Sequence, residues 1–367
     1  MADDQPGLAY ALTRLRGILK PPVRILPPPD GVVFERDVAV PMADGTLLRV
    51  NVFRPEAEGR FPVLLCAHPY GKDRLPARGL FGYRIPFQYR VIRQPAPVAF
   101  SAWTSWEAPD PAFWVPRGYV LVNCDLRGFN KSEGIGDPFS DAEARDIADV
   151  IAWCAAQPWS TGRVGMNGVS YLAISQWKVA ALGPPALKAI CPWEGFTDLY
   201  RDLAYPGGVR EDGFVPFWAK GIARCGRAAF DVRAEQLEHP LIDAFWQSRT
   251  PDLEAIRVPA LICASFSDQG LHSRGSFAAF RRLGSELKWL YTHRGGKWAT
   301  YYSAEALAVQ VRFFDTFLKD IDAGFLAEPK VRLEIHESGS SVAEVRPASN
   351  WPPAEAAFTD WFLTAGG

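Results

Sequence analysis

The chain is 367 residues long, and its 40 lysines and arginines nearly balance its 41 aspartates and glutamates, which leaves a net charge of −1. A chain of this length predicts a large core and about two domains. The charge balance gives no general attraction to nucleic acid or to an anionic membrane, so we expect neither as a partner. No apolar run reaches the ~20 residues that span a membrane, and the opening residues lack the features of a signal peptide.

The six cysteines are scattered along the sequence, with no C-x-x-C pair. Cysteines without such pairing are typical of small buried residues in a reducing compartment, so we predict a cytoplasmic protein. The sequence has no cluster with metal-ligand spacing, no phosphate-binding loop and no dinucleotide fingerprint. We therefore expect no metal and no cofactor, and the sequence leaves the oligomeric state open.

The first third of the chain predicts an arm followed by the edge of a sheet. Residues 1–30 end in three consecutive prolines and predict an N-terminal arm. Apolar residues alternate with polar ones at 32–40 and 47–53, and the Asp44-Gly45 turn signal lies between them. This pattern predicts an antiparallel hairpin at the entry to the sheet.

A central strand and a long aromatic segment follow. The continuous apolar run at residues 62–67 is typical of a strand covered on both faces. The polar loop 68–73 comes after it, at the strand end where α/β sheets place their sites. Residues 78–114 are irregular and rich in Trp, Tyr and Phe. A loop this long is usually a functional cover, and its aromatic content argues against disorder.

Strand and helix patterns alternate through most of the remaining chain. This alternation predicts an α/β fold with a doubly wound, mostly parallel sheet. Residues 193–252 depart from it, because they contain helical patterns at 219–229 and 234–247 and no strand of comparable quality. We interpret residues 193–252 as a helical cap inserted into the α/β domain. The expected strands are 118–123, 187–191, 259–264 and 287–291, and the expected helices include 141–155 and 303–319.

A strand pattern turns directly into a helix pattern at Ser170. An apolar run leads into Gly168-Val169-Ser170, and a helix-forming segment from Leu172 to Leu182 follows at once. This is the pattern of a nucleophile elbow, in which Gly168 leaves room around a strained serine. The common form of the motif has glycine where this chain has Leu172. Taken alone, a serine before a helix is also typical of an ordinary N-cap.

Ser170, Asp268 and His293 fall in that order at the carboxyl ends of three predicted strands, which is the α/β-hydrolase arrangement. In these roles His293 is the base that takes the serine proton, and Asp268 orients the imidazole and stabilises its protonated form. His272 is the alternative base, because it lies four residues after Asp268, near the start of the next helix.

Several short motifs together resemble the CocE/NonD hydrolases. That group includes cocaine esterase, α-amino acid ester hydrolases and X-Pro dipeptidyl-peptidases, and the resemblance covers about residues 35–335. It implies an α/β-hydrolase domain with a helical cap. It also implies an oxyanion hole formed by the Tyr70 hydroxyl and the backbone N–H of Tyr171, although Tyr70 could instead be a packing aromatic. The motifs are Gly168-Val169-Ser170-Tyr171, Pro69-Tyr70, Asp125-Leu126-Arg127-Gly128 and Ser132-Glu133-Gly134.

The chain departs from the family pattern in three ways. Ala173 replaces a usual glycine, which predicts a more crowded elbow. The surroundings of Asp268 and His293 match only loosely. Family members also carry a C-terminal β-sandwich domain, and only its opening is recognisable here. The expected organisation is an arm (1–30), an α/β-hydrolase domain (31–192 and 253–325), a cap (193–252) and the start of a truncated or absent β-sandwich domain (326–367).

We predict a serine hydrolase that cleaves an ester, with an amide as the alternative, through an acyl-enzyme on a small-molecule substrate. An X-Pro dipeptidyl-peptidase, an α-amino acid ester hydrolase or an acyltransferase on the same triad stay open, as does a non-catalytic scaffold. Substrate ammonium groups would need carboxylates, for which the cap region offers Glu194, Asp198, Asp202, Glu211 and Asp212. The candidate substrate-pocket residues are Trp103, Trp106, Trp193 and Phe196.

Overall fold

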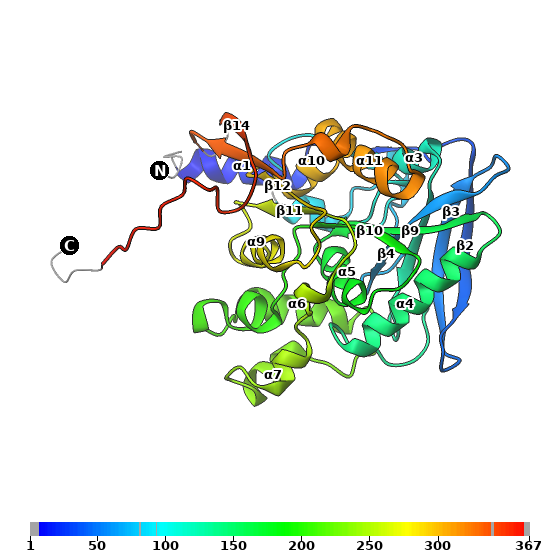
Figure 1. Ribbon diagram of the computed structural model, residues 1–367, viewed down its shortest axis with the longest axis horizontal. Helices are drawn as coiled ribbons and strands as arrows, with labels where there is room; N and C mark the ends of the chain where they lie inside the picture. Colours follow the sequence, from blue (N-terminus) through cyan, green and yellow to red (C-terminus); the bar gives the residue numbers. More distant parts are fainter. Residues whose placement is uncertain (1–6, 81, 93, 339–340, 363–367) are drawn as a thin grey trace.

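The computed structural model describes residues 7–80, 82–92, 94–338 and 341–362. A ten-stranded sheet runs through the molecule in the order β14-β13-β12-β11-β10-β9-β4-β8-β3-β2 (Figure 1). Its strands are β2 (Val32–Pro41), β3 (Leu47–Pro55), β4 (Phe61–His68), β8 (Val120–Asp125), β9 (Ser160–Val169), β10 (Leu187–Trp193), β11 (Ala260–Ser265), β12 (Lys288–His293), β13 (Val331–His336) and β14 (Val342–Ala348).

The strands from β8 to β13 in this order pair in parallel. Antiparallel strands flank them, because β2 and β3 form the predicted hairpin at one edge and β14 folds back on β13 at the other. Helices connect the parallel strands and cover both faces of the sheet. The predicted doubly wound, mostly parallel α/β-hydrolase architecture is confirmed.

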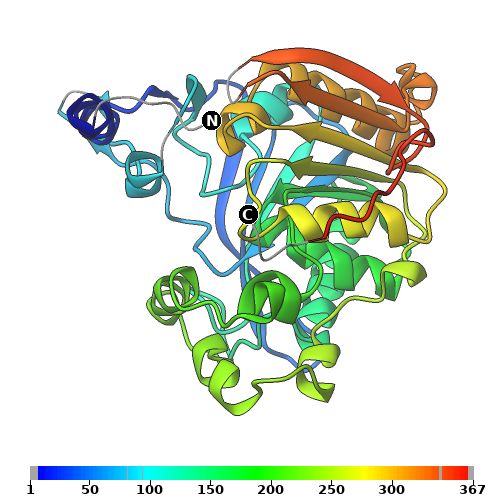
Figure 2. The ribbon, with the colours of Figure 1, turned by 90° about the vertical axis from the view of Figure 1, so that its left-hand side faces the viewer.

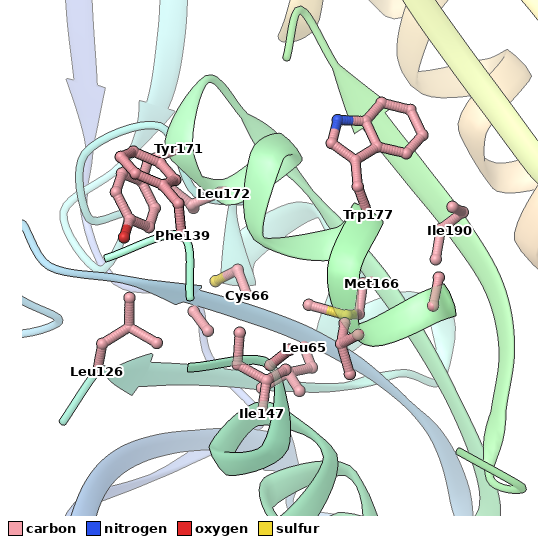
Figure 3. Close-up of a cluster of buried hydrophobic side chains, with 14 of the residues drawn as sticks. Leu65, Cys66, Leu126, Phe139, Ile147, Met166, Tyr171, Leu172, Trp177 and Ile190 are labelled. Atoms are coloured by element: carbon pink, nitrogen blue, oxygen red, sulfur yellow. The ribbon is translucent and has the colours of Figure 1, made fainter. Parts of the chain in front are cut away.

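Alternate residues of the strands fill two cores, one on each face of the sheet. On β4, Val63 and Leu65 belong to the core beneath α4 and α5, whereas Leu64 belongs to the core beneath α3 and α11. This separation follows from the two-residue period of a strand. Figure 3 shows the first core, with Ile147 of α4 beside Leu65. The covering helices in Figure 1 are α4 (Asp141–Ala156), α5 (Tyr171–Leu182) and α9 (Ser273–Arg282) on one face, and α3 (Pro111–Trp114), α10 (Lys297–Tyr301) and α11 (Ala304–Lys319) on the other.

The segment between β10 and β11 is helical and lies at the bottom of the views in Figures 1 and 2. It contains a π-helix (Leu199–Ala204), α6 (Phe214–Ala223), α7 (Val232–Glu238) and α8 (Ala244–Ser248). The predicted helix over 234–247 is split in two. Pro240 interrupts it because proline has no N–H to donate, and Asp243 then caps α8 by accepting from the N–H groups of Phe245 and Trp246.

The N-terminal arm docks on the aromatic segment. After α1 (Gly7–Leu19), β1 (Val23–Leu26) pairs in parallel with β7 (Val98–Ser101). The guanidinium of Arg90, in α2 (Phe87–Val91), donates to the carbonyls of Ile18 and Leu19. Figure 2 shows α1 and α2 together at one side of the molecule. The described residues of the aromatic segment therefore pack against the arm, and Tyr89 among them packs on Phe100, Trp106 and Trp298.

The first strand after residue 326 joins the central sheet. The sequence predicts the start of a β-sandwich domain at residues 326–367, and within this range β13 pairs with β12 in the central sheet. Alternate residues Val331 and Leu333 are buried there, so the strand completes the α/β core. Within residues 349–362 the structure describes no helix or strand, and residues 363–367 lie outside the described residues.

All six cysteines are buried and free, as their scattered pattern predicts. Among the residues that the structure describes, no helix has the length and apolar character needed to cross a membrane.

Candidate active site

Ser170 occupies the turn between β9 and α5, with φ 59° and ψ −118°. A non-glycine residue rarely adopts a positive φ, and such strain is concentrated at functional sites. The geometry requires Gly168, because a Cβ at that position would collide with the side chain of Leu172. The N–H of Ser170 donates to the carbonyl of Trp193 over 3.1 Å, which fixes the turn against β10. The strand-turn-helix predicted at Ser170 is present.

The crowding expected from Ala173 is relieved by a neighbouring glycine. A Cβ on residue 195 would lie 2.8 Å from the Cβ of Ala173, and residue 195 is Gly. The space for the extra methyl group therefore comes from the chain after β10, which the local sequence around Ser170 does not reveal.

His272, the alternative base of the sequence analysis, faces the serine. Its Nε2 lies 3.2 Å from Ser170 Oγ, and its Nδ1 lies 2.5 Å from Asp268 Oδ2. Asp268 follows β11, and the N–H of His272 donates to the Asp268 carbonyl in a single helical turn that leads into α9. Residues four apart on one turn share a face, which brings the imidazole to the carboxylate.

His293 is not brought to Ser170. It ends β12, where its Nε2 lies 3.0 Å from Glu194 Oε1 and its ring stacks on Trp193. Two strands, β10 and β11, separate β12 from β9 in the sheet, and at ~4.8 Å per strand this places His293 far to one side of the elbow. The structure therefore brings His272, and not the expected His293, to the nucleophile candidate Ser170. Chain order alone could not distinguish them.

The surroundings of His272 favour its neutral form. Burial lowers the pKa of the imidazole, the nearby Lys297 lowers it further, and Asp268 opposes both effects. Burial alone would raise the pKa of Asp268, but the charge of Lys297 and the hydrogen bond from His272 hold it well below its usual range. The result is a neutral imidazole beside a carboxylate anion, which is the protonation state that a catalytic base would need.

Both predicted oxyanion donors lie at the serine. The Tyr70 hydroxyl oxygen accepts a 3.2 Å hydrogen bond from the indole Nε1 of Trp218 in α6, which leaves the hydroxyl proton free to donate elsewhere. Burial raises the pKa of Tyr70 and Glu107 raises it further, while hydrogen bonding with Ser170 opposes part of the rise. The amide of Tyr171 is the first of α5 and has no acceptor within the helix.

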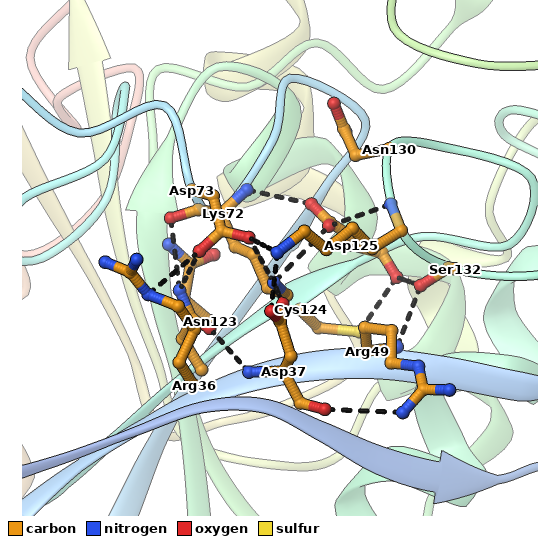
Figure 4. A network of polar contacts seen from close by, with 12 residues as sticks. Arg36, Asp37, Arg49, Lys72, Asp73, Asn123, Cys124, Asp125, Asn130 and Ser132 are labelled. Atoms are coloured by element: carbon orange, nitrogen blue, oxygen red, sulfur yellow. Dashed lines mark hydrogen bonds and ion pairs between the residues drawn. The ribbon is translucent and has the colours of Figure 1, made fainter.

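A buried charge network fixes the loop that carries Tyr70 (Figure 4). The Lys72 side chain is fully buried, and its ammonium contacts Asp37, Asp73 at 2.7 Å and Asp125 at 3.8 Å. The Lys72 N–H donates to Asp125 over 2.8 Å, and the Asn130 amide donates to the Pro69 carbonyl over 2.9 Å. A buried charge must be paired, so Asp125 anchors the Tyr70 loop.

The four candidate pocket residues fall into two groups. Phe196 stacks on His272 with a ring separation of 6.1 Å, and Trp106 precedes Glu107 and packs against Trp298. Trp103 instead packs on Phe34 and Phe53 at the edge of the sheet. Trp193 is fully buried in the core on the α11 face. Phe196 and Trp106 therefore stay pocket candidates, and the other two are packing residues.

Two charged residues near Ser170, Glu107 and Lys297, have no signature in the sequence. Glu107 is 5% exposed, has φ 64° and leaves one carboxyl oxygen without a partner among the described residues. Burial raises its pKa to about 8, although the positive charge of Lys297 acts in the opposite direction. Lys297 lies 2.8 Å from Asp268 Oδ2. Neither residue belongs to a periodic pattern or a short motif, so only their positions in the fold identify them.

The carboxylates considered for a substrate ammonium are engaged elsewhere. Glu194 binds His293, and Asp202 accepts from the N–H groups of Thr197 and Asp198. Asp198, Glu211 and Asp212 bind backbone amides or arginines within the cap. These contacts favour a structural role for all five.

One group among the described residues has metal-ligand geometry. Glu235, Glu238 and His239 place possible ligand atoms within 4.8 Å of one another on and beside α7. Glu238 is exposed, and this group shares no residue with the Ser170 site. Exposed acidic clusters of this kind are common without an ion.

The fold and the strained turn at Ser170 between β9 and α5 place the chain in the α/β-hydrolase class. The sequence pattern of the X-Pro dipeptidyl-peptidase (S15) family matches residues 44–228, just over half of the chain, and the chain belongs to this family. A crystal structure of a CocE/NonD family hydrolase from Staphylococcus aureus is 43% identical, with a TM-score of 0.86 over 91% of this chain and 59% of that one.

Two curated relatives carry enzyme names. Cocaine esterase of Rhodococcus sp. (strain MB1 Bresler) is 30% identical over 388 residues, which cover 90% of this chain and 62% of the relative. A putative Xaa-Pro dipeptidyl-peptidase of Bacillus anthracis is 24% identical over 66% of this chain and 45% of the relative. The chain thus spans less than two thirds of the length of these relatives.

The position of His272 predicts the outcome of two substitutions. His272→Ala should lower kcat for p-nitrophenyl butyrate by ~10⁴-fold or more, because the base and its charge stabilisation are lost together. His293→Gln keeps a hydrogen-bond donor toward Glu194 and should retain most of the activity. Thermal denaturation of both variants controls for folding. Loss of activity in His293→Gln alone would restore His293 as the base.

Proposed function

We propose that this chain is a serine hydrolase that cleaves a carboxylic ester through an acyl-enzyme on Ser170. One observation carries the proposal: His272 lies between Ser170 Oγ and Asp268 Oδ2, at 3.2 Å and 2.5 Å, while the serine occupies a strained elbow. The family of the chain and the name of its cocaine esterase relative support an ester as substrate.

The chemistry follows from the positions of these groups. His272 takes the Ser170 proton as Oγ attacks the ester carbonyl, and Asp268 stabilises the imidazolium that forms. The Tyr70 hydroxyl and the Tyr171 N–H donate to the oxyanion of the tetrahedral intermediate. When the intermediate collapses, His272 protonates the leaving alcohol. Water then repeats the sequence on the acyl-enzyme and releases the acid.

A second candidate substrate carries a free amine, as in an X-Pro peptide or an α-amino acid ester. Glu107 favours this candidate, because its buried carboxyl group has an unpartnered oxygen beside the nucleophile. A substrate ammonium would pair with that oxygen and lower the pKa of the carboxyl group on binding.

The cytoplasmic location, the domain division and the small-molecule partner stay predictions.

Covalent labelling tests the nucleophile. A fluorophosphonate probe should label the wild-type chain on one residue, which peptide mass spectrometry should identify as Ser170. Ser170→Ala should abolish both labelling and turnover of p-nitrophenyl butyrate while it leaves the melting temperature nearly unchanged, because the hydroxyl supplies chemistry and little packing. A folded wild-type chain that is not labelled would contradict the proposed function.

The oxyanion assignment predicts a selective loss in Tyr70→Phe. This change keeps the ring and its packing but removes the donor, so kcat should fall by ~10²–10³-fold with little change in stability. Fluorophosphonate labelling should still locate Ser170. Trp218→Phe is the matched variant, because it removes the indole donor to Tyr70 while it keeps an aromatic ring, and it should have a smaller effect. Near-normal kcat in Tyr70→Phe would make the tyrosine a packing residue.

Glu107→Gln separates the two substrate classes. If Glu107 binds a substrate amine, this substitution should raise KM for Ala-Pro-p-nitroanilide at least tenfold, because an ion pair in a buried site is lost. It should change KM for p-nitrophenyl butyrate less than twofold. Equal effects on both substrates would exclude Glu107 as an amine site.

A further inference from the structure

Lys297 lies at the centre of the charged groups around the nucleophile. It is the first residue of α10, close behind the end of β12, and its side chain is 17% exposed. Its Nζ lies 2.8 Å from Asp268 Oδ2, 3.1 Å from His272 Nδ1 and 3.8 Å from Glu194 Oε2. Because Glu194 also binds His293, Lys297 joins the Ser170–His272–Asp268 set to a second buried pair.

The ammonium form of Lys297 is strongly favoured. Burial alone would lower its pKa, but Asp268, Glu194 and Glu107 surround the amine and raise its pKa above the usual value. A protonated lysine has three N–H donors and no acceptor. Lys297 therefore brings one fixed positive charge into a region that otherwise holds three carboxyl groups.

The short contact between Asp268 and His272 settles which ring nitrogen carries the proton. An ionised carboxylate only accepts hydrogen bonds, so Asp268 requires N–H on Nδ1 of His272 and leaves Nε2 free to accept from Ser170. The Lys297 ammonium then faces a second donor, Nδ1–H, at 3.1 Å. Lys297 thus shares Asp268 with the imidazole and repels a positive charge on it.

We propose that Lys297 is a positioning residue of the hydrolase: its ammonium holds Asp268 in place and opposes protonation of His272, so that the base stays neutral to lower pH. This inference rests on the proposed function for its kinetic consequence only. The charged or titratable groups that face His272 are Asp268 before α9, Lys297 of α10 and Glu194 after β10. Of these, only Lys297 disfavours the imidazolium.

The charge of Lys297 sets the direction in which the pKa of His272 changes when the lysine is replaced. Lys297 lowers the pKa of His272, so removing the ammonium raises it, and a larger fraction of His272 is protonated at a given acidic pH. Protonated His272 cannot accept the Ser170 proton. The acid limb of kcat/KM should therefore move to higher pH when Lys297 is neutralised.

The experiment compares Lys297→Met with Lys297→Arg, which keeps the charge, and with Lys188→Met. Lys188 is an exposed lysine of β10 whose amine donates to the Pro185 carbonyl. The pH dependence of kcat/KM for p-nitrophenyl butyrate is measured from pH 5 to 9. The midpoint of the acid limb should rise by about one pH unit in Lys297→Met, a tenfold loss well below the limb. In Lys297→Arg and in Lys188→Met, the midpoint of the acid limb should stay close to that of the wild-type chain.

A second readout needs no turnover. The imidazole signal of His272, identified by its loss in His272→Gln, is titrated by NMR in the wild-type chain and in Lys297→Met, with Lys297→Gln as the substitute if the methionine variant does not fold. An upward shift supports the proposal, and an unchanged or lower midpoint overturns it. An upward shift in Lys297→Met combined with a wild-type chain that has no esterase activity would support the role of Lys297 and contradict the proposed function.

Discussion

The strained backbone at Ser170 is the constraint on which the rest of the site depends. A positive φ at a serine persists only when its surroundings hold it. Here β9 and α5 meet at the serine, Gly168 gives Leu172 the space it needs, and the Trp193 carbonyl accepts the serine N–H. The parallel sheet supplies these partners, because its strands end at a common edge where their following loops converge.

The helical segment after β10 contributes to the chemistry as well as to the shape of the molecule. Trp218 of α6 donates to the Tyr70 oxygen, so a residue of the cap sets the direction in which the tyrosine proton points. From the opposite side, the Lys72 network holds the loop that carries Tyr70. The proposed oxyanion donor Tyr70 is therefore held from two sides, and Trp218 lies 148 residues from it in the sequence. Displacement of the cap would release this donor.

Buried charge is the second organising feature. Asp268, Glu194 and Glu107 would repel one another in an environment that water screens poorly, and Lys297 offsets part of that repulsion. Glu107 keeps a raised pKa of about 8 because burial outweighs the lysine. The site thus holds a carboxylate, a neutral imidazole and a carboxyl group that is protonated at neutral pH, with each state set by its immediate neighbours.

The sequence by itself determined the sheet, the elbow and the class of chemistry. The apolar run of β4, the hairpin β2–β3 and the Gly168-Val169-Ser170 turn are local patterns, because strand period and turn sterics depend on neighbouring residues. Tertiary structure decided which histidine lies beside Ser170. His272 and His293 both follow strands and both come after Asp268, so chain order treats them alike; the helical turn at Asp268 and the strand order of the sheet separate them. Glu107, Lys297 and Trp218 belong to no local pattern, and they meet the nucleophile only because distant segments pack together.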